Sequence, residues 1–86
     1  MNEVDFREKA ISAIVNFFNN NRGVSDSTPL EASMVYVVWQ CKVLQNNKAL
    51  LSTTVSDGMY YEFTWNGDKE EGYLDCYKKW SNSLVK

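Results

Sequence analysis

The residue types that carry most enzyme chemistry are scarce in this sequence. Its 86 residues include no histidine and only two cysteines, Cys41 and Cys76. Histidine is the commonest general base and the commonest metal ligand, and a serine or cysteine nucleophile usually depends on it. The four glycines are separated and form no phosphate-binding loop. We therefore expect no catalytic, cofactor-binding or metal-binding residues, and we predict that the protein is not an enzyme.

Carboxylates are the remaining candidates for acid–base chemistry, and they cluster at Asp68, Glu70, Glu71 and Asp75. A small enzyme would need such groups to converge in a pocket. Acids at the start of a helix also cap its free N–H groups and complement its dipole, and this structural role explains the positions better. A carboxylate site remains the alternative.

The two cysteines do not have the paired spacing of a zinc site. Cys41 is predicted to be a small core residue on the inward side of a strand. Cys76 is predicted at the edge of the apolar stripe of a second helix. Both are expected to be free thiols, because the protein is expected in the cytoplasm.

Lysines suggest a nucleic-acid-binding alternative through Lys42, Lys48, Lys78 and Lys79. Nine basic and eleven acidic residues give a net charge of −2, whereas nucleic-acid binding normally needs a basic excess or a basic face. Double-stranded-RNA-binding domains share the element order predicted below, but they place basic residues at the start of the last helix. Here residues 68–71 read DKEE, so nucleic acid is the second choice of partner.

The length of the chain predicts a single domain, residues 1–86, which contains all the elements. Apolar residues at spacings of three and four predict an amphipathic helix over residues 3–20, with Asn2 as its N-cap and Gly23 as its C-terminal cap. The predicted apolar face consists of Val4, Ala10, Ile11, Ile14, Val15, Phe17 and Phe18. Residues 24–33 form the predicted linker, with turn formers at 25–28 and one helical turn at about 29–33.

Alternating residues predict three antiparallel strands over 34–44, 48–56 and 59–66. Residues 45–47 form the first predicted turn. A three-residue loop over 56–58 forms the second, because it pairs Leu51 with Phe63 and keeps Glu62 out of the core. The predicted inward residues are Val35, Val37, Trp39, Cys41, Val43, Ala49, Leu51, Thr53, Val55, Met59, Tyr61, Phe63 and Trp65.

Tyr73, Tyr77, Trp80 and Leu84 recur at helical spacing and predict a C-terminal helix that begins near Asp68. The expected fold is therefore α+β and two-layered. It has an N-terminal helix, a three-stranded antiparallel meander and a C-terminal helix, with both helices on one sheet face.

The other sheet face carries more apolar bulk than a solvated face needs, at Tyr36, Val38, Leu50 and Tyr60. Single exposed apolar residues are ordinary, but several on one face indicate a surface for a protein partner. An ordinary half-apolar face is the alternative. A homodimer formed through this face is a further alternative.

The N-terminal residues lack the basic region and the apolar run of a signal peptide. No stretch approaches the roughly 20 apolar residues that span a bilayer. We expect a cytoplasmic protein that does not contact a membrane.

Five segments resemble a family of small uncharacterised proteins encoded by phages and prophages of Gram-positive bacteria. They are residues 35–39 (VYVVW), 44–54 (LQNNKALLSTT), 57–62 (DGMYYE), 66–70 (NGDKE) and 74–80 (LDCYKKW). The resemblance implies a small phage gene product in the bacterial cytoplasm, and it implies no activity. The leading prediction is a non-enzymatic phage accessory protein that binds another protein.

Overall fold

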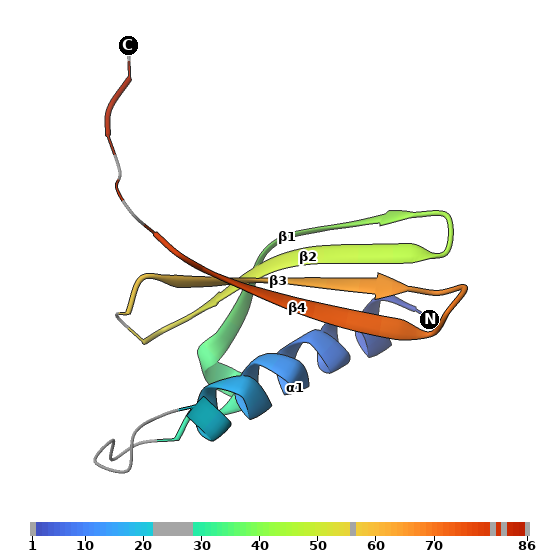
Figure 1. The fold of residues 1–86 in the computed structure, drawn as a ribbon, viewed down its shortest axis with the longest axis horizontal. Coiled ribbons are helices and arrows are strands. Elements are labelled where there is room, and N and C mark those ends of the chain that lie inside the picture. Colours follow the sequence, from blue (N-terminus) through green and yellow to red (C-terminus); the bar gives the residue numbers. More distant parts are fainter. Residues whose placement is uncertain (1, 22–28, 56, 80, 82, 86) are drawn as a thin grey trace.

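The computed structural model describes every residue except 1, 22–28, 56, 80, 82 and 86. The elements are the helix α1 (Glu3–Asn21), the 3-10 turn η1 (Ala32–Met34), and the strands β1 (Val35–Val43), β2 (Asn46–Thr53), β3 (Met59–Asn66) and β4 (Glu71–Lys78). The strands form one antiparallel sheet in the order β1-β2-β3-β4, and α1 lies across one of its faces (Figure 1). The α+β class is confirmed, but the three-stranded meander with a C-terminal helix is wrong.

The helix α1 matches the predicted range within one residue, and its N-cap is confirmed. The backbone N–H of Asp5 donates to Oδ1 of Asn2 at 2.8 Å. The predicted apolar face needs correction, because Phe6 is buried while Val4 is 56% exposed. Phe6 faces the sheet and its ring lies 5.7 Å from that of Phe63, between centroids. With Ala10 and Ile14 it forms the buried stripe of the helix.

The side chain of Asn19, in the last part of α1, is hydrogen-bonded to the backbone of Leu30. The Asn19 side chain donates to the carbonyl of Leu30 at 3.1 Å and accepts its N–H at 2.8 Å. Leu30 is thereby held in the core. The helical turn lies at Ala32–Met34, later than the predicted 29–33. The predicted Gly23 cap and the turn formers at 25–28 lie outside the described residues.

Strand β1 contains a bulge that the alternation pattern does not reveal. Val37 pairs with Leu51 but Trp39 pairs with Leu50, so Val38 is the extra residue. A bulge reverses the facing of the residues that follow it. The predicted inward positions of Trp39, Cys41 and Val43 are therefore wrong, and all three are exposed.

The predicted turn at 45–47 is also wrong. The hairpin turn is Leu44–Gln45, and residues 46 and 47 already belong to β2. Leu44 has a φ of 55°, a conformation that sequence patterns assign to glycine or asparagine. Leucine is not a typical turn residue, so the sequence pattern did not indicate a turn at Leu44.

The pairing of β2 with β3 keeps the predicted faces but not the predicted register. Leu51 lies opposite Tyr61, and Ala49 lies opposite Phe63. This register differs by two residues from the prediction, so every side chain keeps its face. Leu51, Ala49, Tyr61 and Phe63 are accordingly buried. The connection is longer than predicted, since β2 ends at Thr53 and β3 begins at Met59.

Residues 71–78 form β4 rather than a helix, and their pairing with β3 is unbroken from Asn66↔Glu71 to Met59↔Lys78. Tyr73 and Tyr77 are four residues apart, which fits a helix and also fits one face of a strand. Leu74 and Cys76 pack against the core from the other face. Gly72 disfavours a helix by about 1 kcal/mol relative to alanine.

The turn before β4 is shaped by Asn66, not by a helix cap at Asp68. The side-chain oxygen of Asn66 accepts the N–H groups of Asp68 and Lys69 at 3.1 and 3.2 Å. Glu70 has a φ of 52° and leads the chain back into the sheet. The predicted second helix is thus replaced by a hairpin that widens the sheet to four strands.

Among the described residues, no helical segment combines the length and apolar character needed to cross a bilayer.

Candidate functional site

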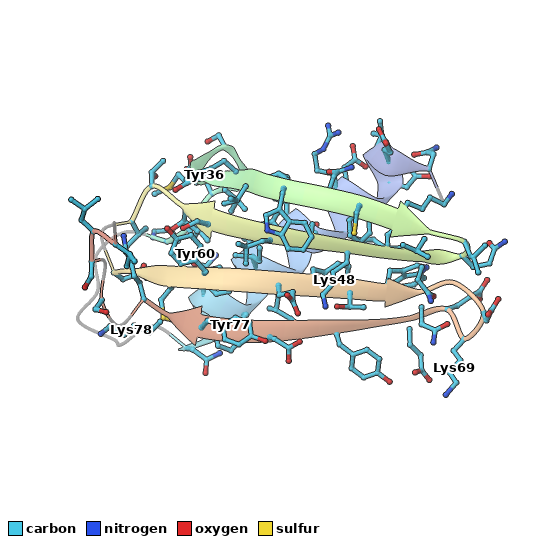
Figure 2. All side chains as sticks on the ribbon, turned by 90° about the horizontal axis from the view of Figure 1, so that it is seen from above. Tyr36, Lys48, Tyr60, Lys69, Tyr77 and Lys78 are labelled. Carbon is cyan, nitrogen blue, oxygen red and sulfur yellow. The ribbon has the colours of Figure 1, made fainter. Side chains whose placement is uncertain are left out.

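The sheet face opposite α1 is open and carries a row of three tyrosines. Direct cross-strand pairing joins Tyr36 of β1 to Ser52 of β2, Ser52 to Tyr60 of β3, and Tyr60 to Tyr77 of β4. Figure 2 looks onto this face and shows Tyr36, Tyr60 and Tyr77 across one end of the sheet. Ser52 is buried between its neighbours and donates to the Met59 carbonyl at 2.9 Å. The row is therefore part of the regular sheet.

The adjacent row extends this apolar surface. The bulge places Val38 and Trp39 of β1 on the open face, where Trp39 lies opposite Leu50 of β2. Exposed fractions are 49% for Tyr36, 43% for Trp39 and 51% for Tyr77. Leu50 and Tyr60, on the central strands, are partly buried. We call the six residues Tyr36, Val38, Trp39, Leu50, Tyr60 and Tyr77 the open-face patch.

The structure brings together all four residues that the sequence assigned to partner binding: Tyr36, Val38, Leu50 and Tyr60. It adds Trp39 and Tyr77, which sequence reasoning placed in the core. Trp39 was missed because of the bulge. Tyr77 was missed because its spacing to Tyr73 was interpreted as helical, although Gly72 was a usable signal against a helix.

Charged groups lie beside the patch. Lys48 Nζ of β2 is 3.3 Å from Glu62 Oε1 of β3. Glu62 also lies directly opposite Asp75 of β4. Two like charges at directly paired positions destabilise a sheet. Among the described residues, Lys48 is the only cation in an ion pair on this face, so Glu62 and Asp75 together keep a net negative charge.

The candidate nucleic-acid contacts do not share one face. Lys48 lies on the open face and is paired with Glu62. Lys42 pairs with Asn47, and Lys78 pairs with Met59, so both belong to the side of the sheet that faces α1. Lys79 follows β4, and its N–H donates to the Gly58 carbonyl. This scatter gives no continuous basic stripe for a phosphate backbone.

The candidate carboxylates are also spread out. Asp68 and Glu70 are exposed in the turn, and Asp75 lies on the open face of β4. Glu71 begins β4 and accepts a hydrogen bond of 2.7 Å from the Tyr73 hydroxyl, which raises the pKa of Tyr73. Within the described part of the chain, no three Cys, Asp or Glu side chains gather closely enough to hold a metal ion.

The two thiols differ in environment. Cys41 is exposed on the open face, which corrects its predicted core position. Cys76 lies on the side that faces α1, where burial and, secondarily, the nearby Asp75 raise the pKa of its thiol. The two residues sit on the opposite edge strands β1 and β4, at least about 14 Å apart at ordinary strand spacing, which is too far for a disulfide.

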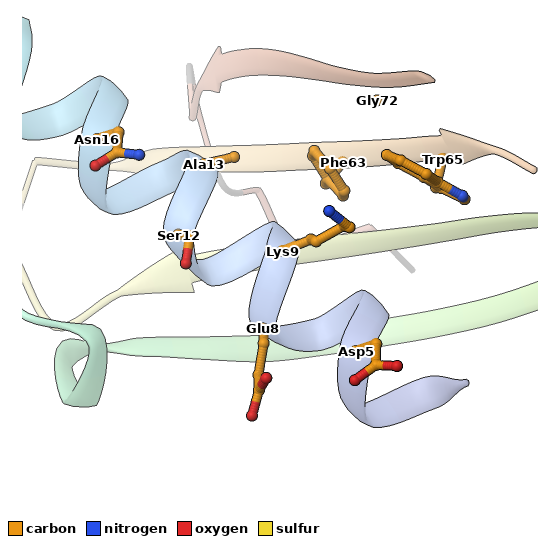
Figure 3. A pocket seen from close by; sticks show the side chains of 9 residues that line it. All are labelled: Asp5, Glu8, Lys9, Ser12, Ala13, Asn16, Phe63, Trp65 and Gly72. Atoms are coloured by element: carbon orange, nitrogen blue, oxygen red, sulfur yellow. The ribbon is translucent and has the colours of Figure 1, made fainter. Parts of the chain in front are cut away.

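A hollow lies between α1 and strands β3 and β4, with a volume of about 760 Å³ (Figure 3). Its floor is formed by Phe63, Trp65 and Gly72, and its rim by polar residues of α1. Lys9 extends over Trp65, with Nζ 5.1 Å from the ring centroid. This groove exists because one helix covers a four-stranded sheet. The open face gathers four aromatic rings and is the better candidate site.

Comparison with known proteins gives a family but no activity. No curated protein and no solved structure matches the chain. A family model described as a family of unknown function, DUF6275, matches residues 7–86. Because this match covers nearly all of the helix–sheet unit described above, the chain belongs to the DUF6275 family.

Proposed function

We propose that this protein is a non-enzymatic protein-binding module and that the open-face patch is its binding surface. The observation that carries the proposal is the distribution of aromatic rings. Among the described residues, the patch contains four of them, at Tyr36, Trp39, Tyr60 and Tyr77, whereas the buried core contains three, at Phe6, Tyr61 and Phe63, with Phe18 and Trp65 packed against it.

Such a distribution suits a protein interface. Tyrosine and tryptophan are enriched at interfaces because their rings lose water on binding while their polar groups keep a hydrogen-bond partner. Burying apolar surface contributes roughly 25 cal/mol per Å². The patch rests on paired strands, so its side chains need little ordering before they bind.

The biological setting belongs to the same proposal. A small phage or prophage accessory protein in the bacterial cytoplasm is supported by the resemblance of residues 34–80 to phage-encoded proteins. A non-enzymatic role is supported by the lack of histidine and by the spread of the four candidate carboxylates over the turn and β4. Protein is favoured over nucleic acid because Lys48 is already paired and the other candidate lysines lie elsewhere.

The test is an affinity capture with a matched pair of variants. The tagged protein, the variant Tyr36→Ser/Tyr60→Ser, and the control Val4→Ser are incubated with nuclease-treated lysate of lysogenic Gram-positive cells. Val4 is an exposed apolar residue on α1, away from the open face. Circular dichroism establishes that each variant is folded.

A stoichiometric protein captured by the wild type and by Val4→Ser, but lost with Tyr36→Ser/Tyr60→Ser, supports the proposal. Equal capture by the folded double variant contradicts it. A parallel titration with duplex and single-stranded nucleic acids addresses the alternative partner. Binding that weakens steeply with salt there would favour nucleic acid instead.

A further inference from the structure

We infer that the partner covering the open-face patch is a second copy of this chain, packed sheet against sheet. The inference rests on the proposed function, because it names the protein that the patch binds. Three features of the face support it: its area, the arrangement of its charges, and the size of its uncovered aromatic surface relative to the small core.

The area of the face is sufficient for a stable dimer. Four strands about 4.8 Å apart, each of about eight residues rising about 3.4 Å, present a flat area of roughly 500 Å². Two such faces stacked together remove at least about 1,000 Å² from water. This reaches the lower limit of about 1,000 Å² for a specific interface.

The order of the strands makes the face complementary to itself. A two-fold axis parallel to the strands, passing between β2 and β3, sets β1 of one copy over β4 of the other and β2 over β3. Tyr36 then faces the partner's Tyr77. Trp39 faces the partner's Asp75, so its indole N–H has an acceptor. Sheets stacked in this way lie about 10 Å apart, with their side chains interdigitated.

The charges beside the patch are compatible with the same pairing. Within one copy, Lys48 is paired with Glu62, and Asp75 lies directly opposite that carboxylate. In the two-fold arrangement, Lys48 faces the partner's Thr64, Glu62 faces the partner's Leu50 and Asp75 faces the partner's Trp39. None of these three charges therefore faces a like charge across the interface, a contact that would oppose association.

The fold has a small buried core and an uncovered sheet face, and this also favours a permanent partner. The helix covers one sheet face only, and the buried core of the described residues contains nine apolar side chains. An 86-residue domain has a small margin of buried area. A second copy is present wherever the first is made, so it can cover the four rings of the patch at all times. The assembly becomes helix, sheet, sheet, helix.

The test is sedimentation equilibrium of the purified protein between about 1 and 300 μM, a range chosen to span weak and tight pairing. Three proteins are compared: the wild type, Tyr36→Ser/Tyr77→Ser, and the control Val4→Ser. The inference predicts dimers for the wild type and the control, and a dissociation constant at least about 100-fold higher for the double variant, because both tyrosines are lost from each copy. Circular dichroism checks folding.

A second measurement needs no variant. Cys41 lies on the open face and Cys76 on the other side of the sheet. If the faces pack together, the rate at which a maleimide modifies Cys41 falls as the protein concentration rises through the dimer range. The rate for Cys76 stays constant.

A wild type that remains monomeric throughout overturns the inference. A dimer that survives in the folded double variant, with unprotected Cys41, overturns it as well, since another surface then forms the contact. Neither result decides the proposed function. That function fails separately, when a protein captured from lysate binds equally to the wild type and to the folded Tyr36→Ser/Tyr60→Ser.

Discussion

Single residues determine which side chains reach the open face. Val38 is one residue more than the register of β1 and β2 requires, and it turns Trp39 and Cys41 away from the core. Phe6, near the start of the helix, instead packs into the core against Phe63. Strict alternation cannot show the bulge, because the bulge depends on how two strands pair. Helical spacing could have shown the position of Phe6, because Phe6, Ala10 and Ile14 recur at intervals of four.

The corrected face of α1 can be tested by truncating one side chain at a time. Phe6→Ala should lower the free energy of unfolding by about 3–5 kcal/mol, because it leaves a cavity beside Phe63. Val4→Ala should change it by less than about 0.5 kcal/mol, because Val4 is exposed. Urea denaturation measures both. Similar losses for the two variants would contradict the placement of the helix.

The two thiols should differ in their response to pH. The pKa of Cys76 is raised, mainly by burial, so its reactive thiolate forms only at higher pH than in an unfolded chain. In Cys41→Ser, alkylation by iodoacetamide should therefore be slow at pH 8 and should accelerate as the pH rises. The same rate measured in urea, at equal pH, should be higher. A folded-state rate equal to the unfolded-state rate would contradict the burial of Cys76.

The same shift affects stability. Because the folded state raises the pKa of Cys76, its protonated thiol favours folding at low and neutral pH. That contribution is lost as the pH rises through the folded-state pKa. Cys76→Ala should therefore reduce the alkaline loss of stability.

At the scale of elements, the sequence predicted α1, β1, β2 and β3 closely, and it predicted the faces of β2 and β3 correctly. Their patterns are long and nearly unbroken. The pattern of residues 71–78 is short, and its tyrosines at positions 73 and 77 satisfy both periods. The neighbouring edge of β3 decides between them by offering eight backbone pairs. That information is not local to the segment.

Replacing Gly72 with alanine should change the free energy of unfolding in opposite directions for a helix and for the strand β4. In a helix, Gly72→Ala would stabilise the protein by about 1 kcal/mol. In β4, the added Cβ would lie 2.8 Å from Cζ of Phe63 and 3.2 Å from Cε3 of Trp65, so both rings must move. We expect the free energy of unfolding to fall by about 1–3 kcal/mol. A stabilised variant would argue for the helix and against β4.

The turn between β1 and β2 offers a stabilising change. Leu44 has a positive φ, which costs a residue with a side chain about 1–2 kcal/mol, and it is 85% exposed. Leu44→Gly removes that cost but adds flexibility to the unfolded chain. The net expectation is an increase of about 0.5–1 kcal/mol in the free energy of unfolding. A decrease would show that the Leu44 side chain makes contacts that offset its backbone strain.

At the scale of the whole molecule, one helix and one sheet leave an aromatic face uncovered. The four residues assigned to partner binding from the sequence lie together there. Tyr36 and Val38 come before the reversal that the bulge causes, and Leu50 and Tyr60 lie on strands whose faces were predicted correctly. The extent of the patch could not be predicted, since Trp39 and Tyr77 reach it through the bulge and the fourth strand. The proposed protein-binding role depends on that complete patch.

The most direct test of this role is ¹⁹F NMR of the protein labelled with 3-fluorotyrosine, with the five tyrosines assigned by single Tyr→Phe variants. Spectra are compared without and with the binding partner, whether that is added protein or a second copy at rising concentration. The resonances of Tyr36, Tyr60 and Tyr77 should shift or broaden on binding, while that of the buried Tyr61, on the other side of the sheet, stays unchanged. Binding that leaves the first three resonances unmoved would contradict the assignment of the open-face patch as the interface.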